Sequence, residues 1–273
     1  MVEASLAALS PAELRSAIRS GDYGGRTPGL ALGYVQANLV VVEQDDAFDF
    51  LRFCVRNPAA APVLEVGEPG DPRIAQLARD SDIRFDLPRY RVFEEGVVVA
   101  ETEDIEAYWR DDLVYFLLGC SLTFEAALLD GGVPLRHLES GSAVPAYITN
   151  VECTPAGRFQ GPLVVSMRPV PGDLVARAVS ITERLPAGHG APVHIGAPEA
   201  LGISDLAAVD YGEPPNVEPG DIPVFWACGV TPQAIAEHVK LSFMISHAPG
   251  HMYVTDVRSD SHSLQAPDAS CGY

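Results

Sequence analysis

Basic residues are scarce in this sequence. Lysine and arginine together number 18, against 37 aspartate and glutamate residues, and the formal net charge over 273 residues is −19. Such a charge repels phosphate backbones and anionic lipid headgroups, so we expect neither nucleic acid nor a membrane as partner. The acidic residues are dispersed, as is typical of a solvated surface. An anionic substrate would therefore need a local cluster of arginine.

Cysteine is also sparse, and its number and spacing argue against both a zinc site and a disulfide framework. The five cysteines are odd in number and include no CxxC pair. This argues against a zinc site and a disulfide framework, and favours free thiols in a reducing cytosol. No apolar run is long enough to span a bilayer, and the first residues lack the order of a secretory signal. We expect a cytoplasmic protein.

Apolar runs of strand length alternate with helical patterns along most of the chain. Ser10, Pro11 and Glu13 have the spacing of a capping box. We expect helices at residues 11–20, 45–57, 73–79, 102–109, 122–129, 174–184 and 232–239. We expect strands at 34–42, 63–66, 113–118, 142–151, 161–169, 222–227, 241–246 and 252–257, and a hairpin at 92–101. The alternation predicts an α/β fold, with a mixed sheet covered by helices on both faces.

The stretch 221–240 contains the clearest junction between a strand and a helix. Gly229 allows a sharp turn after the apolar run, Thr231 suits the N-cap, and Pro232 suits the first helical position. Free N–H groups at such a helix start can bind a carboxylate or a phosphate. The alternative is an ordinary strand-to-helix turn.

Two more junctions place polar side chains where a strand ends. Cys120 and Ser121 follow the run at 113–118, with Glu125 one helical turn further on. Ser166 and Arg168 end the run at 161–169. A helix start can lower the pKa of a thiol, and arginine can hold a carboxylate with two hydrogen bonds. The alternatives are a buried structural cysteine, a capping serine, a solvated glutamate and an arginine in a structural ion pair.

Two amides and two histidines complete the set of candidates. Gln36 and Asn38 share one face of a strand, where they could bind a polar ligand or satisfy buried backbone groups. His189 and His194 are surrounded by glycines, which let the backbone approach a ligand closely. Their spacing does not match a helical metal motif, and no carboxylate or thiolate cluster is adjacent.

Several long motifs resemble one known family. They are GYVQANL, FLRFCVRNP, DIRFDLPRYRVF, GCSLTFE, GPLVVSMRP, HGAPVHIG, IPVFWACGVTPQ and SHAPGHM. They resemble the hydro-lyase family that includes D-glutamate cyclase, over residues 10–257. The resemblance implies a lyase that converts D-glutamate reversibly to 5-oxo-D-proline with loss of water. It also implies an α/β/α sandwich with a smaller α+β portion, which we expect around residues 85–160 of the region 1–257, before a flexible tail at 258–273.

The motifs and junctions together give two sets of site residues. The expected catalytic residues are His189, His194, Cys120 and Glu125. The expected substrate-binding residues are Arg168, Gln36, Asn38, Ser121, Ser166, Gly229 and Thr231. The histidines can exchange protons near neutral pH, and Arg168 can hold a carboxylate.

The sequence departs from the family pattern at four positions. The family usually has Cys at Ala61, Met at Ala146, a basic residue at Ile148 and Asp at Ala197. Loss of a cation and an acid suggests a substrate other than glutamate and less charged. The alternative is that these positions never touch substrate.

The resulting hypothesis is a carbon–oxygen lyase for a small carboxylic or amino acid. One alternative is a non-catalytic protein that binds a small carboxylate, and another is a metal-dependent hydrolase using His189 and His194. We expect no cofactor, no metal and no macromolecular partner other than a homo-oligomer, which the sequence leaves open.

Overall fold

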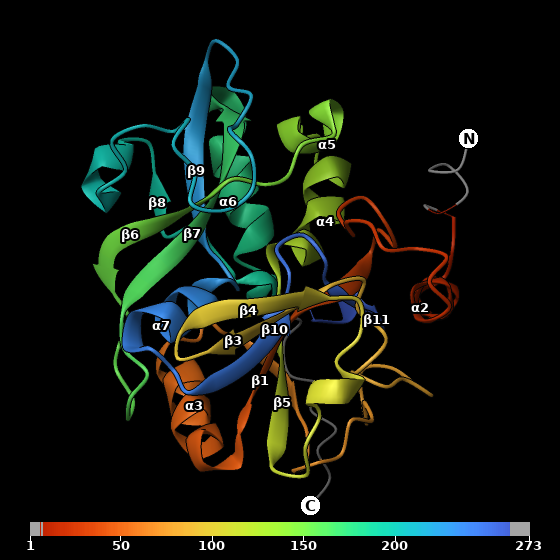
Figure 1. Ribbon diagram of the computed structural model, residues 1–273. Coiled ribbons are helices and arrows are strands. Elements are labelled where there is room, and N and C mark those ends of the chain that lie inside the picture. The colour runs from red at the N-terminus through yellow and green to blue at the C-terminus, as the bar shows by residue number, and fades with distance from the viewer. Residues whose placement is uncertain (1–5, 7, 263–273) are drawn as a thin grey trace, which may run out of the picture.

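The computed structural model describes residue 6 and residues 8–262, and two antiparallel sheets form its frame (Figure 1). The larger sheet has seven strands. Six lie in the order β2 (Val63–Val66), β5 (Leu113–Gly119), β1 (Tyr34–Glu43), β10 (Phe243–His247), β3 (Tyr90–Glu94) and β4 (Val97–Thr102). The seventh, β11 (Tyr253–Arg258), also pairs with β1. All the expected strands are present, although neighbouring strands are antiparallel throughout both sheets in the described residues.

The smaller sheet has four strands and stands above the larger one in Figure 1. Its order is β6 (Ala146–Glu152), β7 (Pro162–Pro171), β9 (Asp221–Ala227) and β8 (His194–Ile195). The smaller portion expected around 85–160 does not coincide with this sheet, because β3 and β4 belong to the larger one. Of the tail expected at 258–273, Arg258 ends the strand β11 and residues 259–262 form a short 3-10 helix, whereas residues 263–273 lie outside the described residues.

Helices cover one face of the larger sheet. The α-helices are α2 (Pro11–Arg19), α3 (Gln44–Arg56), α4 (Glu125–Asp130), α5 (Arg136–Ser140), α6 (Val175–Thr182) and α7 (Thr231–Val239). Phe50 and Phe53 of α3 and Ile235 of α7 pack on Val40 and Val42 of β1. The α/β class is therefore confirmed, with α3 and α7 burying one side of the strand on which Asn38 lies.

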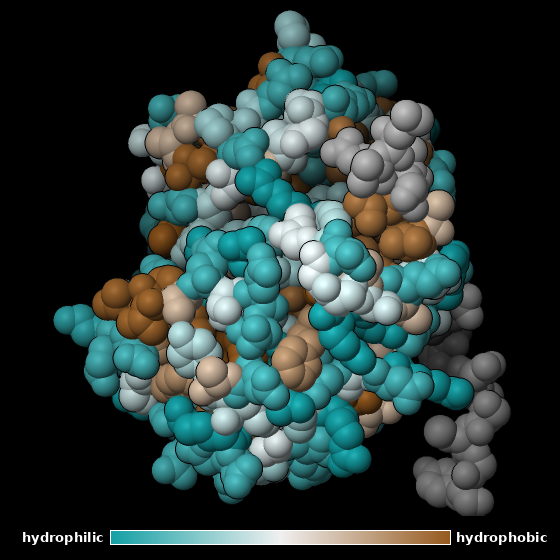
Figure 2. Space-filling model, turned by 45° about the vertical axis from the view of Figure 1, so that its right-hand side comes forward, coloured by the Kyte–Doolittle hydropathy of each residue, from teal (hydrophilic) through white to brown (hydrophobic). Residues whose placement is uncertain are grey.

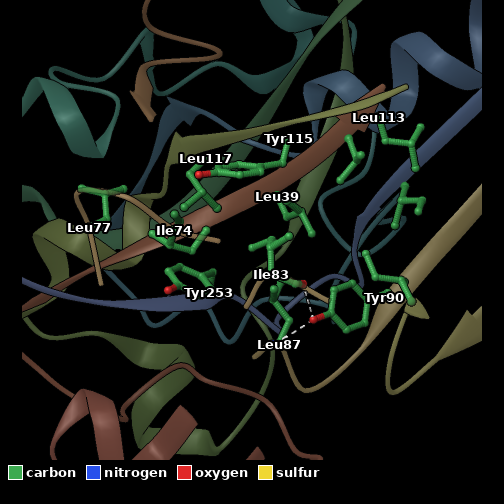
Figure 3. Packing of buried hydrophobic residues seen from close by; sticks show 14 of the residues in the cluster. Leu39, Ile74, Leu77, Ile83, Leu87, Tyr90, Leu113, Tyr115, Leu117 and Tyr253 are labelled. Carbon is green, nitrogen blue, oxygen red and sulfur yellow. Dashed lines mark hydrogen bonds between the residues drawn. The ribbon is translucent and has the colours of Figure 1, made fainter. Parts of the chain in front are cut away.

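The opposite face of the larger sheet is buried beneath irregular chain. Leu39, Leu117 and Tyr253 pack against Leu77 and Ile83, which lie in a segment without regular structure (Figure 3). The Tyr90 hydroxyl closes this cluster, since it donates to the Ile83 carbonyl and accepts from the Leu87 N–H (Figure 3). Because its hydroxyl makes both hydrogen bonds within the protein, the tyrosine can be fully buried.

The helix expected at 73–79 is absent, and Glu65 supplies the reason. Its carboxylate accepts hydrogen bonds from the backbone N–H groups of Ala75, Gln76 and Leu77. These bonds fold the segment around the side chain in place of a helical ladder. The helix expected at 102–109 is also reduced, to a 3-10 turn at Glu106–Tyr108.

The smaller sheet is buried on both faces. Val224 and Trp226 of β9 pack on α4 and α6, whereas Phe225 points to the other side, against Leu201 and Ile203. Beyond these cores, the face in Figure 2 is mostly hydrophilic, with separate apolar patches. No helix within the described part of the chain is long and apolar enough to cross a membrane.

Candidate active site

A cavity of about 670 Å³ opens between the two sheets. Strands of both sheets line it, through Asn38 of β1, Arg91 of β3, Glu101 of β4, His247 of β10, Ala146 and Ile148 of β6, and Ser166 of β7. The junctions after β5 and β9 contribute Cys120, Ser121, Cys228 and Val230. Residues from both junctions therefore line the same cavity.

Asn38 and Gly229 fix the geometry where the two junctions meet. The Asn38 side chain donates from Nδ2 to the Gly119 carbonyl. A Cβ atom on Gly229 would lie 1.9 Å from Asn38 Nδ2. Gly229 does not itself line the cavity, and its φ is not positive. Close packing against Asn38 therefore requires this glycine.

We expect Gly229→Ala to lower the free energy of unfolding by about 1–3 kcal/mol, because the new methyl group must displace the anchored amide. Urea unfolding measures the loss. Gly24→Ala is the matched control, since its Cβ would meet only Glu103 Oε1, at 3.7 Å. Equal stability of the two variants would contradict the packing role of Gly229.

Arg168 does not line the cavity but lies directly behind Ser121 and Ser166, which form the cavity floor. The side chain is 1% exposed and does not line the cavity. Its Nη2 atom lies 2.5 Å from Glu125 Oε1 and 3.1 Å from Ser121 Oγ, and Nη1 lies 3.5 Å from Ser166 Oγ. The rings of Phe124 and Trp226 flank the guanidinium, with centroids 4.9 and 5.8 Å from Cζ. The structure thus pairs Arg168 with Glu125 and with two serines that do line the cavity.

Glu125 is a buried partner in this ion pair. Burial alone would raise the pKa of its carboxyl group, but Arg168 and His137 outweigh burial and lower the pKa. His137 Nε2 lies 3.0 Å from Glu125 Oε1. Because Glu125 is ionised, 1% exposed and not part of the cavity lining, it balances the charge of Arg168.

The two cavity thiols are protonated at rest. Burial raises the pKa of Cys120 to about 12, against a smaller opposing effect of the Leu122 N–H. Burial also raises the pKa of Cys228, although the N–H groups of Val230 and Gly229 favour its thiolate. The alternative of a buried cysteine therefore fits Cys120, because loss of hydration raises its pKa more than the helix start lowers it.

Neither of the expected catalytic histidines lines the cavity. His189 is buried, its Nδ1 lies 2.7 Å from the Ala59 carbonyl, and burial lowers its pKa to about 4. His194 lies on β8, with Nε2 3.0 Å from the Ala197 carbonyl and its ring beside Phe225. Their catalytic role remains a prediction that the geometry does not support.

Two further expected ligand residues serve the backbone. Gln36 Nε2 donates to the carbonyls of Thr27 and Leu30. Thr231 is the first residue of α7 and not its N-cap, which is Val230. Its hydroxyl donates to the Cys228 carbonyl and accepts from the Val164 N–H. Neither side chain lines the cavity.

Two histidines in the cavity wall come instead from the SHAPGHM motif. His247 is 1% exposed, and burial lowers its pKa to about 4. His251 Nδ1 lies 3.0 Å from the Pro249 carbonyl, and burial lowers its pKa as well. The turn between them, with Pro249 and Gly250, was the available sequence signal.

The cavity lining carries charges of both signs. Arg91 and Arg26 are the cations, and Glu101, Asp210 and Glu237 are the carboxylates. Arg91 Nε donates to Glu101 at 3.2 Å. Partial burial raises the pKa of Glu237 more than nearby Arg91 lowers it, and Glu237 has no ion-pair partner within residues 8–262.

Of the four departures from the family pattern, two lie in the cavity. Ala146 and Ile148 line it, and Ile148 is 38% exposed. Ala61 is fully buried in the core, and Ala197 lies outside the cavity. Only the changes on β6 can therefore alter direct contacts with a ligand there.

The cavity combines amide, hydroxyl, thiol, imidazole and ionic groups with apolar lining, a composition typical of small-molecule sites. The family model described as D-glutamate cyclase matches residues 114–256. A Bacillus licheniformis protein is 54% identical over 94% of this chain and 98% of its own length, and a Rhodococcus jostii protein is 56% identical over 95% and 98%. Both are named "Putative hydro-lyase", as is Bacillus subtilis YcsI, which is 51% identical over 93% and 98%.

The chain therefore belongs to the D-glutamate cyclase family of hydro-lyases, and it is a lyase. Among solved structures, a nitrogen repressor-like protein from Methanococcus jannaschii matches with a TM-score of 0.38 and 12% identity. That alignment covers 86% of this chain and 91% of the other.

Proposed function

We propose that this hydro-lyase acts on a small amino acid, in the reversible cyclisation of D-glutamate to 5-oxo-D-proline or a closely related dehydration. The family model supports this reaction type. The observation that carries the proposal is the presence of both charge signs around one neutral polar floor. An amino acid is itself a zwitterion, so it matches such a cavity better than a simple dicarboxylate does.

The charged wall gives each end of the substrate a partner. Arg91, whose side chain is 26% exposed, can bind the α-carboxylate with two hydrogen bonds. Glu237 can bind the ammonium group and accept its proton, since its pKa is raised. Binding through both groups would orient the side-chain carboxyl towards the floor formed by Ser121 and Ser166.

Cyclisation requires one base and one acid. The neutral amine bonds to the side-chain carboxyl carbon and loses a proton, while one carbon–oxygen bond breaks and the oxygen leaves as water. His251 is suited to be the base, because its lowered pKa keeps the imidazole neutral and its Nδ1 already engages Pro249. The protonated thiols of Cys120 and Cys228 can donate to the departing oxygen.

The alternatives gain little from the geometry. The departures at Ala61, Ile148 and Ala197 motivate the non-catalytic carboxylate-binding alternative. Of these, Ala61 and Ala197 do not line the cavity. A metal-dependent hydrolase needs a cluster of ligands. The described residues contain no group of three His, Cys, Asp or Glu side chains that could hold a metal ion.

The direct test of the proposed function is incubation of the purified protein with D-glutamate and separately with 5-oxo-D-proline, followed by chiral chromatography. We expect interconversion in both directions. We expect His251→Gln to lower kcat by about 100-fold, because the base is lost. His238→Gln is the control, since this exposed histidine does not line the cavity. Binding of either compound without turnover would favour the non-catalytic alternative.

We expect Ile148→Lys to lower the KM for D-glutamate by about 10-fold, because it restores a cation to the wall that the substrate carboxylates face. Ile195→Lys is the control, since Ile195 is exposed on β8 and does not line the cavity. The measurement is steady-state kinetics of both variants. Equal KM values would show that position 148 does not touch substrate.

A further inference from the structure

We infer that Ser121 and Ser166 form an oxyanion site, and that Arg168 sets the direction of their hydroxyl protons without touching substrate. The inference rests on the proposed function. The oxyanion is the charge that develops on the side-chain carboxyl oxygen when the amine attacks. Ser121 and Ser166 line the cavity, whereas Arg168 lies behind them.

The hydrogen-bond chemistry of arginine decides which way the serine protons point. A guanidinium only donates, so each serine oxygen that contacts it must accept. Arg168 contacts Ser121 Oγ at 3.1 Å and Ser166 Oγ at 3.5 Å. Each hydroxyl therefore keeps its own proton for another partner.

The described part of the protein supplies no acceptor for the proton of the Ser121 hydroxyl. No described residue accepts a hydrogen bond from its hydroxyl, and the nearby Glu125 Oε1 already accepts twice from Arg168. Since Ser121 is buried and lines the cavity, its O–H is available to a ligand oxygen. The Ser166 hydroxyl donates to the sulfur of Cys228, which favours the thiolate. Sulfur is a weak acceptor, so this proton can turn to a ligand oxygen instead.

The framework holds these donors in place before substrate binds. Ser166 and Arg168 lie two residues apart on one face of β7, where they pair with Trp226 and Val224 of β9. The aromatic rings flanking the guanidinium limit its movement. Donors fixed in this way need no reorganisation as charge develops, which is the basis of oxyanion stabilisation.

Charge balance indicates that the site acts on the transition state and not on the resting substrate. The Arg168 cation is neutralised by Glu125 at 2.5 Å, so the serines present dipoles and no net charge. Attack of the amine adds negative charge to the side-chain carboxyl oxygen, so these dipoles attract the developing oxyanion more than the resting carboxylate. The site should therefore affect kcat more than KM.

Kinetics of three variants test this inference. We expect Ser121→Ala to lower kcat by about 100-fold with KM unchanged within about twofold. Arg168→Lys should show the same pattern, and the double variant should lose no more than either single variant, because both changes remove one function. A raised KM with normal kcat, or additive losses, would overturn the inference.

Arg15→Lys separates a positioning role from a structural one. Arg15 is also buried, and it pairs with Asp256 and the Val254 carbonyl away from the cavity. We expect this control to lower the thermal melting temperature and leave kcat unchanged. If Arg168→Lys fails to fold, Ser121→Ala still decides the matter with Arg168 in place.

Neutron diffraction of the deuterated protein tests the inference without any turnover. We expect the deuterium on Ser121 Oγ to point into the cavity, away from Arg168. A deuterium directed at a protein acceptor would overturn the inference. Absence of turnover with D-glutamate and 5-oxo-D-proline would instead reject the proposed function, and the deuterium position would still decide the orientation of the donor.

Discussion

Glu125→Leu is expected to lower the free energy of unfolding by about 3–5 kcal/mol, because it leaves Arg168 buried without its counter-charge. Both side chains are 1% exposed, so water cannot replace the lost carboxylate. Urea unfolding, followed by circular dichroism, measures the change. A loss below about 1 kcal/mol would show that the guanidinium finds another partner.

The double variant Glu125→Leu/Arg168→Met is the informative control. Replacing a buried ion pair by apolar side chains is often neutral for stability. We therefore expect the double variant to recover most of the stability lost in Glu125→Leu. Its kcat should remain low, because Ser121 and Ser166 no longer have the guanidinium behind them. Recovery of both stability and activity would reduce Arg168 to a purely structural role.

Acidification from pH 7 to pH 5 is expected to lower the free energy of unfolding by about 3–4 kcal/mol through two histidines. Burial lowers the pKa of His189 and of His247 from 6.5 to about 4. Between these values the unfolded chain binds protons that the folded chain does not. Their contribution is therefore fully present above pH 6.5 and is lost as the pH falls towards 4.

Urea midpoints at pH 7 and pH 5 measure this dependence. We expect His189→Gln and His247→Gln each to remove about half of the difference between the two pH values. His194→Gln is the control, since His194 is only partly buried. If both variants lose as much free energy of unfolding between pH 7 and pH 5 as the wild type, folding does not lower the pKa of these imidazoles.

Local patterns predicted the elements and part of the site. The two-residue period placed Asn38 on the face of β1 opposite Leu39, and the structure has it there, in the cavity. The predicted junction after β5 places Cys120 and Ser121 at the cavity. Ser166 also lines the cavity, although it lies in the middle of β7 and not at its end. These predictions succeeded because strand period and turn chemistry are encoded within a few residues.

Long-range pairing was not available from the sequence. Arg168 was expected to hold substrate, but its partner is Glu125, which lies 43 residues earlier in the chain. His247 and His251 reach the cavity because β10 pairs with β1 and β3, and no local pattern specifies that choice of neighbours. A remote carboxylate likewise decided the segment at 73–79, where Glu65 captures the backbone N–H groups.

The central claim is that the cavity between the two sheets is the active site of this hydro-lyase. A crystal structure of the protein with 5-oxo-D-proline tests it most directly. We predict that the ligand lies in this cavity, with its carboxylate at Arg91 and its ring carbonyl within hydrogen-bonding distance of Ser121 Oγ. Ligand bound elsewhere, for example beside His189 or His194, with Ser121 unoccupied in active protein, would contradict the account.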